Sequence, residues 1–542
     1  MLLFGTTLVA SAHDWRLLLS TPCLPEHFDV HFYPGGHEFM THSSAPIFQK
    51  VCTTISVVTP RAEVQQAAVS RDCTVHSPLH TVRWVPTAVT SSNTSTSPLP
   101  ALSISLGSDI ASLNEEHRLA LSQGRLVVEL FRDFTAAVDP SGWVDLEAAM
   151  CARLMTLVQQ VCAEGVPAGS RLILLLPASM DGSMTAGFSK AVPMEDPDLH
   201  CVRIFIPGDR RTSFSAQHAV ALSARYPTET DLWVEGDTVA VPRLFSEPVI
   251  RAKGSFRLPH GCSYLVTGGR GGIGSKLVDW LLDGMMLPPS SIILLVRKSK
   301  ALTAPSHPRG VRIIEADISD AVNLCSNLEL GKLQHVGGIF HLAGSLDDGL
   351  VINMNETRLR TPIVPKSAAL HLLELVKVRG WAPRWLVCFS STSSLFGFHG
   401  QSNYCAANAL LDHMAMWPPT TAERLRIISV NWGPWEEVGM AAVGSKAHAQ
   451  AVKDGERPLS TQVNACAQVF YNFFVLLTCG SLSGGARKLG HDPLLCRVPV
   501  LLLSPVRSVP HCVGEVAFSQ LSGDQGAVDC ALNELGTQSQ TS

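Results

Sequence analysis

Short apolar runs alternate with longer amphipathic segments along the first half of the chain. Between the runs, residues 146–164 and 213–224 have the spacing of apolar positions that is typical of helices. Alternating strands and helices favour a parallel sheet covered by helices on both faces. The pattern therefore predicts an α/β unit over residues 76–250. Its predicted strands lie at 81–86, 125–130, 171–176 and 201–206.

A second alternating series follows and predicts another α/β unit over residues 255–480. Its apolar runs are short and rich in β-branched residues, which favours strands. The fold class expected for the chain is thus α/β, with two Rossmann-like, doubly wound parallel sheets. The strands predicted in the second unit lie at 264–267, 291–297, 311–317 and 338–344.

A glycine-rich loop, residues 268–274, opens the second unit. It stands between the apolar run 264–267 and a segment, 275–282, with helical periodicity. Glycines in this context permit a tight turn and a close approach of the backbone to a pyrophosphate, and the helix N-terminus offers free N–H groups to the phosphates. A strand before the glycines and a helix after them distinguish a dinucleotide site from a chance glycine pattern.

The ends of the following strands indicate which nicotinamide nucleotide is bound. Arg297 ends the second strand, where a carboxylate usually meets the 2′-hydroxyl of NAD and an arginine accommodates the 2′-phosphate of NADP. No acidic residue occurs from Pro288 to Ser306, so we predict NADPH as the cofactor. Asp317 ends the third strand and suits the adenine amino group. The residues expected to contact the cofactor are Thr267, Gly268, Gly269, Gly271, Gly272, Ile273, Gly274, Arg297, Asp317, Ile318, Ala343 and Gly344.

A serine and a tyrosine further along the chain have the spacing that ketone reduction requires. Ser391 lies thirteen residues before Tyr404, and Asn408 follows the tyrosine by one helical turn. A hydroxyl can hold a carbonyl oxygen while a phenol protonates it. Ser390 and Ser393 compete for the role of the hydroxyl, but the thirteen-residue spacing favours Ser391.

A cation is also needed beside the phenol. Simple short-chain dehydrogenases place a lysine four residues after the tyrosine, where this chain has Asn408. Lys366, just ahead of a helix predicted at 367–376, is the candidate for the missing charge. A lysine and an asparagine exchanged between two neighbouring helices can keep both head groups in one place.

That exchange and several motifs resemble the ketoreductase domain of modular, type I polyketide synthases and the related domain of animal-type fatty acid synthase. The resembling segments are TyrLeuValThrGlyGlyArgGlyGlyIleGly (264–274), PheHisLeuAlaGlySerLeuAspAspGly (340–349), LysSerAlaAlaLeuHisLeuLeuGluLeu (366–375), 389–412 and AsnTrpGlyProTrp (431–435). The resemblance implies a catalytic tetrad of Lys366, Ser391, Tyr404 and Asn408.

The resemblance also implies the reaction, which is the reduction of a β-ketoacyl thioester tethered to an acyl carrier protein. Tyr404 would protonate the nascent alkoxide, and Ser391 would hydrogen-bond the same oxygen. Lys366 would lower the pKa of the phenol, and Asn408 would hold a water or a backbone carbonyl in a proton relay. Other polyketide synthase domains, in the same chain or separate from it, are the expected partners.

A triplet after the fourth strand resembles the motif of B-type ketoreductases, which deliver a D-configured hydroxyl. The tryptophan that marks A-types is absent, because Phe396 stands eight residues before Tyr404, and Ala406 occupies the position where a proline would indicate epimerisation. The non-epimerising subtype is therefore favoured. The residues assigned to substrate and stereochemistry are Leu346, Asp347, Asp348, Gln401 and Trp435.

The first unit carries neither a glycine loop nor a tyrosine tetrad. Residues 190–199 and 231–236 are similar to segments of the structural subdomain of the same family, a degenerate Rossmann unit that braces the catalytic one. We therefore interpret 76–250 as this structural subdomain and 255–480 as the NADPH-binding catalytic subdomain.

Composition excludes several other classes of protein. A formal charge of −4 gives no basic field for nucleic acid, and fifteen scattered cysteines without a CxxC pair argue against zinc and against a disulfide framework. Residues 1–12 are apolar like a secretory signal but lack its positive beginning. A cytoplasmic enzyme without a metal or a membrane segment is the prediction.

The ends of the chain are less informative. Residues 1–75 are interpreted as a fragment of a preceding synthase domain or as unstructured, residues 436–459 as a substrate lid, and residues 481–542 as a disordered tail. No carrier, ketosynthase or acyltransferase motif occurs, so the chain is either part of a larger synthase or receives its substrate in trans. Two alternatives stay open: a fatty acid synthase reductase, and a non-catalytic nucleotide-binding module.

Overall fold

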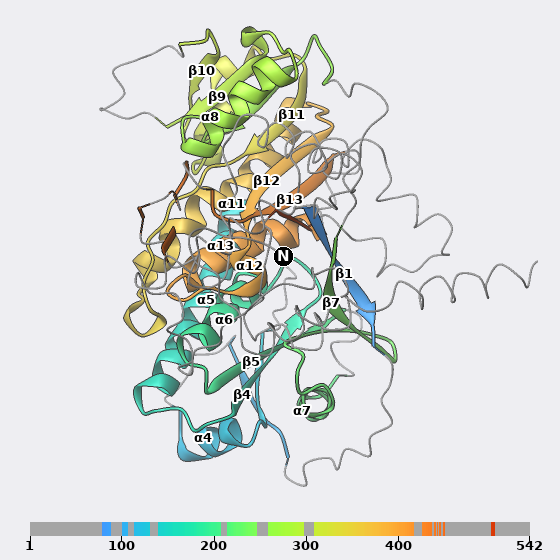
Figure 1. The fold of residues 1–542 in the computed structure, drawn as a ribbon, viewed down its shortest axis with the longest axis vertical. Helices are drawn as coiled ribbons and strands as arrows, with labels where there is room; N and C mark the ends of the chain where they lie inside the picture. The colour runs from blue at the N-terminus through green and yellow to red at the C-terminus, as the bar shows by residue number, and fades with distance from the viewer. Residues whose placement is uncertain are drawn as a thin grey trace, which may run out of the picture. The chain divides into compact units, whose positions relative to one another are not determined.

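The computed structural model describes residues 79–87, 100–106, 113–130, 139–207, 214–246, 258–297, 308–416, 425–435, 438–440, 442, 444–445, 448–449 and 500–503 (Figure 1). The predictions for residues 1–75, and for all but four of residues 481–542, lie outside these ranges.

The first half of the described chain forms a mixed sheet of seven strands. Strands β2 to β6 are parallel in sequence order, whereas β7 pairs antiparallel with both β6 and β1. The sequence predicted a purely parallel sheet here, and that was wrong for β1 and β7. Gly236, with a φ of 63°, turns the chain between β6 and β7, so these two strands form a hairpin rather than a crossover. The strands are β1 (Leu79–Pro86), β2 (Leu102–Ser105), β3 (Leu126–Glu129), β4 (Ser170–Pro177), β5 (Leu199–Ile206), β6 (Asp231–Glu235) and β7 (Thr238–Ser246).

The second half forms a parallel sheet in the strand order of a dinucleotide-binding fold. The order is β10-β9-β8-β11-β12-β13, so the chain reverses direction across the sheet between β8 and β11. Ligands of open α/β sheets bind at such a switch point, beyond the carboxyl ends of the strands. The strands are β8 (Ser263–Thr267), β9 (Ile292–Val296), β10 (Arg312–Glu315), β11 (Val336–His341), β12 (Trp385–Ser391) and β13 (Arg426–Trp432).

A short strand joins the two sheets. Strand β14 (Val500–Leu503) pairs parallel with β13 and antiparallel with β1. It lies inside the region 481–542 that the sequence predicted to be disordered, so the prediction was wrong for these four residues. The two-sheet α/β fold class itself is confirmed.

Helices from both halves meet beside the second sheet. α6 packs against α13, and α5 packs against α11 (Figure 1). A Cβ added at Gly187 of α6 would lie 2.4 Å from the carbonyl oxygen of Cys405 in α13, so this close crossing depends on glycine. The main helices are α4 (Glu115–Ser122), α5 (Pro140–Ala163), α6 (Ser183–Glu195), α7 (Ala216–Arg225), α8 (Gly272–Asp279), α9 (Ala321–Ser326), α10 (Leu328–Gly331), α11 (Glu356–Arg379), α12 (Ser393–Phe396) and α13 (Ser402–Met416).

α11 begins ten residues before Lys366, whereas the sequence predicted that this lysine precedes its helix. Pro362 and Pro365 lie inside the helix and leave the carbonyls of Arg358 and Thr361 without their usual helical donors. Side chains outside the helix replace those donors. The Asn403 amide donates to the Arg358 carbonyl at 2.9 Å, and the Ser345 hydroxyl donates to the Thr361 carbonyl at 2.7 Å. The prolines therefore turn α11 into an acceptor for α13 and for the loop after β11.

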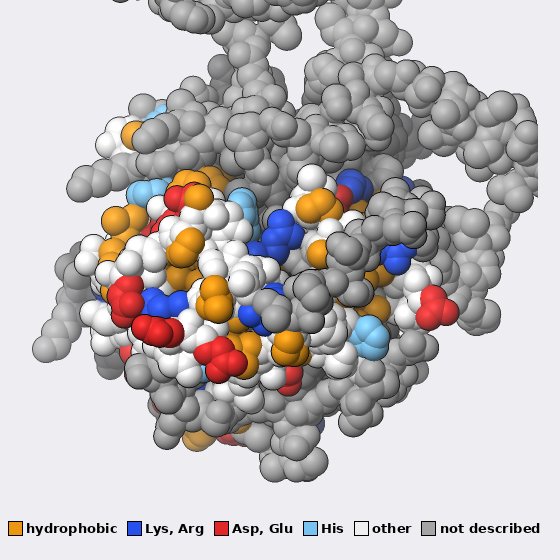
Figure 2. All heavy atoms as spheres, turned by 90° about the horizontal axis from the view of Figure 1, so that it is seen from below, with side chains coloured by type: hydrophobic (Ala, Val, Ile, Leu, Met, Phe, Trp, Pro, Cys, Tyr) orange, Lys and Arg blue, Asp and Glu red, His pale blue; other side chains and the backbone are white. Residues whose placement is uncertain are grey.

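Surface charge offers little guide to function. Acidic, basic and apolar side chains of the described residues lie interspersed on the face shown in Figure 2. Among the described helices, none is both long enough and apolar enough to cross a membrane. The cavity at the switch point is therefore the candidate functional site.

Candidate active site

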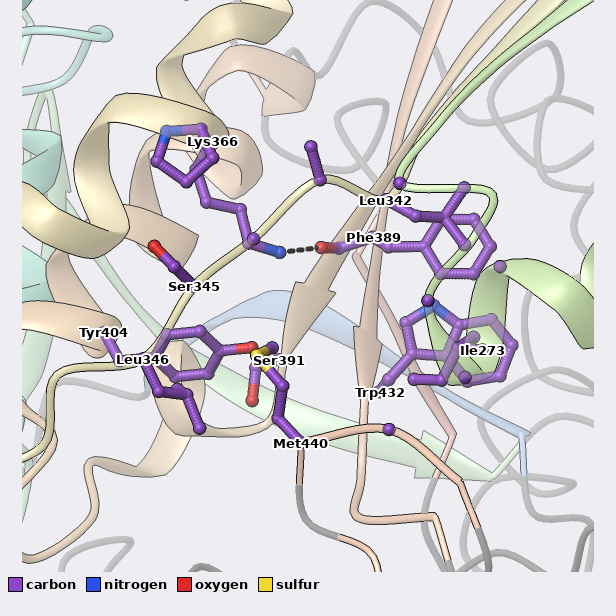
Figure 3. A pocket seen from close by; sticks show the side chains of 18 of the residues that line it. Ile273, Leu342, Ser345, Leu346, Lys366, Phe389, Ser391, Tyr404, Trp432 and Met440 are labelled. Atoms are coloured by element: carbon purple, nitrogen blue, oxygen red, sulfur yellow. Dashed lines mark hydrogen bonds between the residues drawn. The ribbon is translucent and has the colours of Figure 1, made fainter. Parts of the chain in front are cut away.

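A cavity of about 920 Å³ opens at the carboxyl ends of the strands of the second sheet (Figure 3). The glycine loop after β8, the loop after β11, the end of β12 and the segment after β13 line it. Its volume suits a ligand of dinucleotide size together with part of a substrate. The predicted site residues that line it are Gly268, Gly269, Gly271, Gly272, Ile273, Gly274, Arg297, Asp317, Ile318, Ala343, Gly344, Leu346, Lys366, Ser391, Gln401, Tyr404 and Trp435.

The glycine loop is packed so closely that side chains would not fit. Gly268 has a φ of 67°, and a Cβ on Gly274 would lie 2.2 Å from the Gly268 carbonyl oxygen. No side chain caps the N-terminus of α8, and no acidic residue occurs in its first turn. This helix end therefore offers N–H groups and a favourable dipole to an anion, which is worth about 0.3–1 kcal/mol per charge.

Arg297 and Asp317 line the same end of the cavity. Arg297 directly follows β9 and is exposed. One carboxylate oxygen of Asp317 accepts from the backbone N–H of Ser319 at 3.0 Å and from its hydroxyl at 2.6 Å. These two bonds fix the turn after β10 against the cavity wall.

Thr267 does not line the cavity, although the sequence grouped it with the cofactor contacts. It is fully buried, and its hydroxyl oxygen accepts from the N–H groups of Leu342 and Ala343 at 3.1 and 3.2 Å. Nδ1 of the imidazole of His341 lies 2.9 Å from the same hydroxyl, and its Nε2 lies 3.1 Å from the Lys366 carbonyl. Since a carbonyl only accepts, Nε2 carries the proton and Thr267 donates to Nδ1.

His341 thus links the nucleotide loop to the middle of α11. Burial lowers the pKa of His341 to about 3, so the ring is neutral at physiological pH and keeps this tautomer. Sequence reasoning placed His341 within a motif but assigned it no role.

Three residues of the predicted tetrad converge on one wall of the cavity. In Figure 3 the ring of Tyr404 extends toward Ser391, and Lys366 lies beside them. The Lys366 amino group donates to the Phe389 carbonyl at 2.5 Å and lies 5.9 Å from the centroid of the Tyr404 ring. Among the competing serines, Ser393 is fully buried and does not line the cavity.

Asn408 lies behind this wall rather than in it. Its amide nitrogen donates to the Tyr404 carbonyl at 2.8 Å, while its side-chain oxygen is buried and has no partner among the described residues. An unsatisfied buried acceptor is unusual and suits a water molecule. The backbone carbonyl that Asn408 was expected to hold is therefore that of Tyr404 itself.

The pKa of Tyr404 is raised to about 12, chiefly because the phenol is buried, although hydrogen bonding by Asn408 opposes the shift. The sequence interpretation expected Lys366 to lower it. In the structure the Lys366 amino group donates to the Phe389 carbonyl and lies 5.9 Å from the centroid of the Tyr404 ring. Burial lowers the pKa of Lys366 to about 8, against opposing effects of Cys388 and Asp412. Both groups are therefore protonated at neutral pH.

A buried hydrogen-bond network stabilises the end of β12, which carries Ser391. Asp412 accepts from the hydroxyls of Ser394 at 2.5 Å and Ser429 at 2.6 Å. The Asn431 amide donates to Asp412 at 2.9 Å and to the Ser391 carbonyl at 3.1 Å. This network fixes the end of β12, and with it Ser391. Both Asn431 and Asp412 lie within motifs that the sequence analysis quoted, but no signal there separated them from core residues.

The three residues of the predicted stereochemical triplet, Leu346, Asp347 and Asp348, do not all face the cavity. Leu346 lines the cavity, whereas the two aspartates do not. Asp347 pairs with Arg358 at 3.0 Å, and Asp348 accepts from the Gln401 amide at 3.0 Å. The aspartates therefore hold the loop in position.

Only a few residues of the predicted lid are described. A Cβ on Gly272 would lie 2.4 Å from the backbone nitrogen of Gly439, and Met440 lines the cavity near Tyr404 (Figure 3). The segment after β13 thus covers the start of α8 in this structure. The rest of 436–459 lies mostly outside the described residues.

Comparison with known proteins agrees with this geometry. Residues 262–437 match the family model described as KR domain. A phenolphthiocerol/phthiocerol polyketide synthase of Mycobacterium tuberculosis is 26% identical over 360 residues, which are 65% of this chain and 18% of the relative. The 6-methylsalicylic acid synthase of Aspergillus niger is 26% identical over 338 residues, 57% of this chain and 18% of the relative. The chain thus spans less than a fifth of the length of these relatives.

Two solved structures extend the likeness across both sheets. The A-type ketoreductases from a modular polyketide synthase align with a TM-score of 0.58 at 21% identity, over 80% of this chain and 94% of that one. An A1-type ketoreductase aligns with a TM-score of 0.57 at 25% identity, over 73% and 91%. Together with the matched residues 262–437, these alignments show that the chain contains a ketoreductase domain and has the two-sheet fold of the ketoreductases of modular polyketide synthases.

Proposed function

We propose that the chain reduces a β-ketoacyl thioester to the β-hydroxyacyl thioester with NADPH. The observation that carries this proposal is the convergence of Ser391, Tyr404 and Lys366 on one wall of a cavity whose other end is a glycine loop. One end of the cavity thus suits the pyrophosphate of a dinucleotide, and the other offers a proton donor and a hydrogen-bond donor to a ketone.

The residues present fit NADPH. The close-packed loop around Gly268 and Gly274 and the uncapped start of α8 suit a pyrophosphate. Arg297 is the cation expected at a 2′-phosphate, and no described acid replaces it at the end of β9. When bound, the nicotinamide supplies the hydride for the β-carbon.

The chain's own groups handle the charge that develops on the carbonyl oxygen. Tyr404 is the proton donor, and its raised pKa keeps the phenol protonated until the alkoxide forms. Ser391 donates a hydrogen bond to the same oxygen. Lys366 provides a positive charge nearby, and the free side-chain oxygen of Asn408 suits a water that returns a proton to the phenol.

We further propose the B-type outcome, a D-configured hydroxyl. Leu346, Asp347 and Asp348 match the B-type triplet, and Phe396 stands where an A-type chain has tryptophan. Phe396 is buried against Phe398 and does not line the cavity, so it offers no guide to a substrate there. This assignment differs from the A1-type named for the 25% identical structure.

The substrate is expected to arrive on an acyl carrier protein. The curated relatives are polyketide synthases several times longer than this chain, and their remaining domains could supply and accept the acyl group. Partner domains of a synthase, in the same polypeptide or separate, are therefore part of the proposal.

Chiral analysis of the product tests the proposed outcome. The chain is incubated with a β-ketoacyl-N-acetylcysteamine thioester and NADPH, with NADH as the comparison. We expect the D-alcohol, formed faster with NADPH. Predominance of the L-alcohol would contradict the B-type assignment, and equal rates with NADH would contradict the role of Arg297.

The rate should also depend on pH through Lys366. Burial lowers the pKa of this lysine to about 8, so its positive charge is present below that pH and is lost as the pH rises through it. We expect kcat/KM to fall about tenfold between roughly pH 7 and 9, because the free enzyme then loses the cation. The Lys366→Arg variant keeps its charge and should show a weaker but flat profile. An identical fall of kcat/KM in the wild type and in Lys366→Arg would show that deprotonation of Lys366 does not cause the pH dependence.

A further inference from the structure

The loop between β11 and α11 forms one wall of the cavity and is held from the other subdomain. Ser345 and Leu346 of this loop line the cavity, and residues 342–350 have no helix or strand of their own. A wall built from irregular backbone needs external partners to keep one conformation. Val351 directly follows this loop, and its side chain is buried in the main core.

Both backbone groups of Val351 are bound by side chains of the structural subdomain. Its N–H donates to a carboxylate oxygen of Glu195, at the end of α6, at 2.6 Å. Its carbonyl accepts from the amide nitrogen of Gln159, in α5, at 2.8 Å. The same nitrogen also donates to the Met354 carbonyl at 2.8 Å.

The second carboxylate oxygen of Glu195 reaches the segment before the catalytic helix. It accepts from the N–H of Gly400 at 3.1 Å, and Gly400 lies four residues before Tyr404. The Gly400 carbonyl in turn accepts from the N–H of Gly349 at 2.8 Å. One carboxylate therefore joins the wall that carries Leu346 to the segment that carries Tyr404.

An ionised carboxylate suits this position because it offers acceptors only. Each of its oxygens faces a backbone N–H, and hydrogen bonds to a charged acceptor are stronger than neutral ones. A glutamine at 195 would accept one of these bonds but turn its NH₂ group toward the other donor. The arrangement therefore distinguishes glutamate from its closest isostere.

We propose that Glu195 and Gln159 are positioning residues for the reaction, and that the structural subdomain uses them to fix the cavity wall relative to Tyr404. This inference rests on the proposed function and deepens it, because it assigns part of the orientation of the β-ketoacyl substrate to residues outside the catalytic subdomain. Neither side chain lines the cavity or touches the catalytic tetrad.

The Glu195→Gln variant tests the proposal in the full chain. We expect kcat to fall about tenfold and the minor enantiomer of the alcohol to increase, because loss of one charged hydrogen bond loosens the reacting geometry. The Kd of NADPH should stay within about twofold, since the nucleotide end is untouched. The matched control is Glu164→Gln, an exposed acid at the C-cap of α5 that pairs with Arg118.

Hydrogen exchange gives a second readout that does not depend on turnover. The N–H groups of Val351 and Gly400 should be protected in the wild type, and at least one should exchange faster by about tenfold or more in Glu195→Gln. Gln159→Leu removes two donated bonds without a change of charge, and it should loosen residues 351–354 in the same way. Gln159→Leu takes the place of Glu195→Gln as the test variant if Glu195→Gln fails to fold.

The outcomes separate this proposal from the proposed function. Unchanged exchange at both amides would show that the Glu195 carboxylate does not hold the cavity wall in place. Faster exchange with unchanged kcat and product composition would overturn its positioning role. A wild-type chain that binds NADPH but reduces nothing would refute the proposed function. The exchange experiment would still decide whether Glu195 and Gln159 hold the cavity wall.

Discussion

Replacing Tyr404 with phenylalanine is expected to lower kcat about 10³-fold while NADPH still binds. The phenol lies on the cavity wall beside Ser391, where it can protonate the alkoxide. Without it, the alkoxide must take its proton from water. The ring itself remains, so the packing of α13 and the nucleotide end of the cavity are unchanged. NADPH oxidation with a β-ketoacyl thioester measures the rate, and a fluorescence titration measures NADPH binding.

Tyr226→Phe is the matched control for this variant. Tyr226 is a buried tyrosine at the end of α7, and it does not line the cavity. Its variant should reduce the substrate at the wild-type rate. Tyr404→Phe turning over as fast as the wild type would eliminate the phenol as the proton donor.

Replacing Gly274 with alanine is expected to weaken NADPH binding about 5- to 150-fold, the range that an overpacking cost of about 1–3 kcal/mol implies. The added Cβ would lie 2.2 Å from the Gly268 carbonyl oxygen and 2.7 Å from the Gly269 Cα. Both contacts are with backbone, which cannot rotate away as a side chain can. The loop must therefore open, and its N–H groups leave the positions that suit a pyrophosphate. A fluorescence titration with NADPH measures the loss.

A second glycine variant separates nucleotide binding from general destabilisation. Gly380 ends α11 with a φ of 64°, and a Cβ added there meets no atom within 4 Å. Gly380→Ala should lower the thermal midpoint, because a left-handed alanine costs about 1 kcal/mol, but leave NADPH affinity unchanged. Equal losses of affinity in the two variants would contradict a specific role for the glycine loop.

The parts of the fold that local patterns determine could be predicted from the sequence. The alternation of strands and helices predicted both α/β units, because a strand buried on both faces and an amphipathic helix leave distinct periodicities. The glycine loop was recognisable since a strand and a helix flank it. Ser391 and Tyr404 could be proposed from their thirteen-residue spacing, and Lys366 from its place ahead of a predicted helix together with the family resemblance.

Long-range pairings left no comparable signal. The antiparallel direction of β1 depends on its neighbours β7 and β14, which lie far away in the sequence. The early start of α11 was hidden by Pro362 and Pro365, which usually interrupt a helix. Only the folded structure reveals that Asn403 and Ser345 satisfy the freed carbonyls.

The pKa of Tyr404 could not be derived from the sequence for a similar reason. A lysine assigned to the same site suggested a lowered pKa, but the outcome depends on burial and on where the ammonium points. In the structure the Lys366 amino group is engaged by the Phe389 carbonyl, and burial dominates at the phenol. A protonated phenol is nevertheless the form that a reduction needs.

Reduction of a carrier-bound substrate is the most direct test of the proposed ketoreductase activity. The chain is incubated with NADPH and a β-ketoacyl thioester on an acyl carrier protein, and the intact carrier is analysed by mass spectrometry. We expect a mass gain that corresponds to one hydride and one proton, with the hydride traceable to deuterium-labelled NADPH. An unchanged acyl group, in a chain that binds NADPH and alongside a ketoreductase that reduces the same carrier, would contradict the proposed activity.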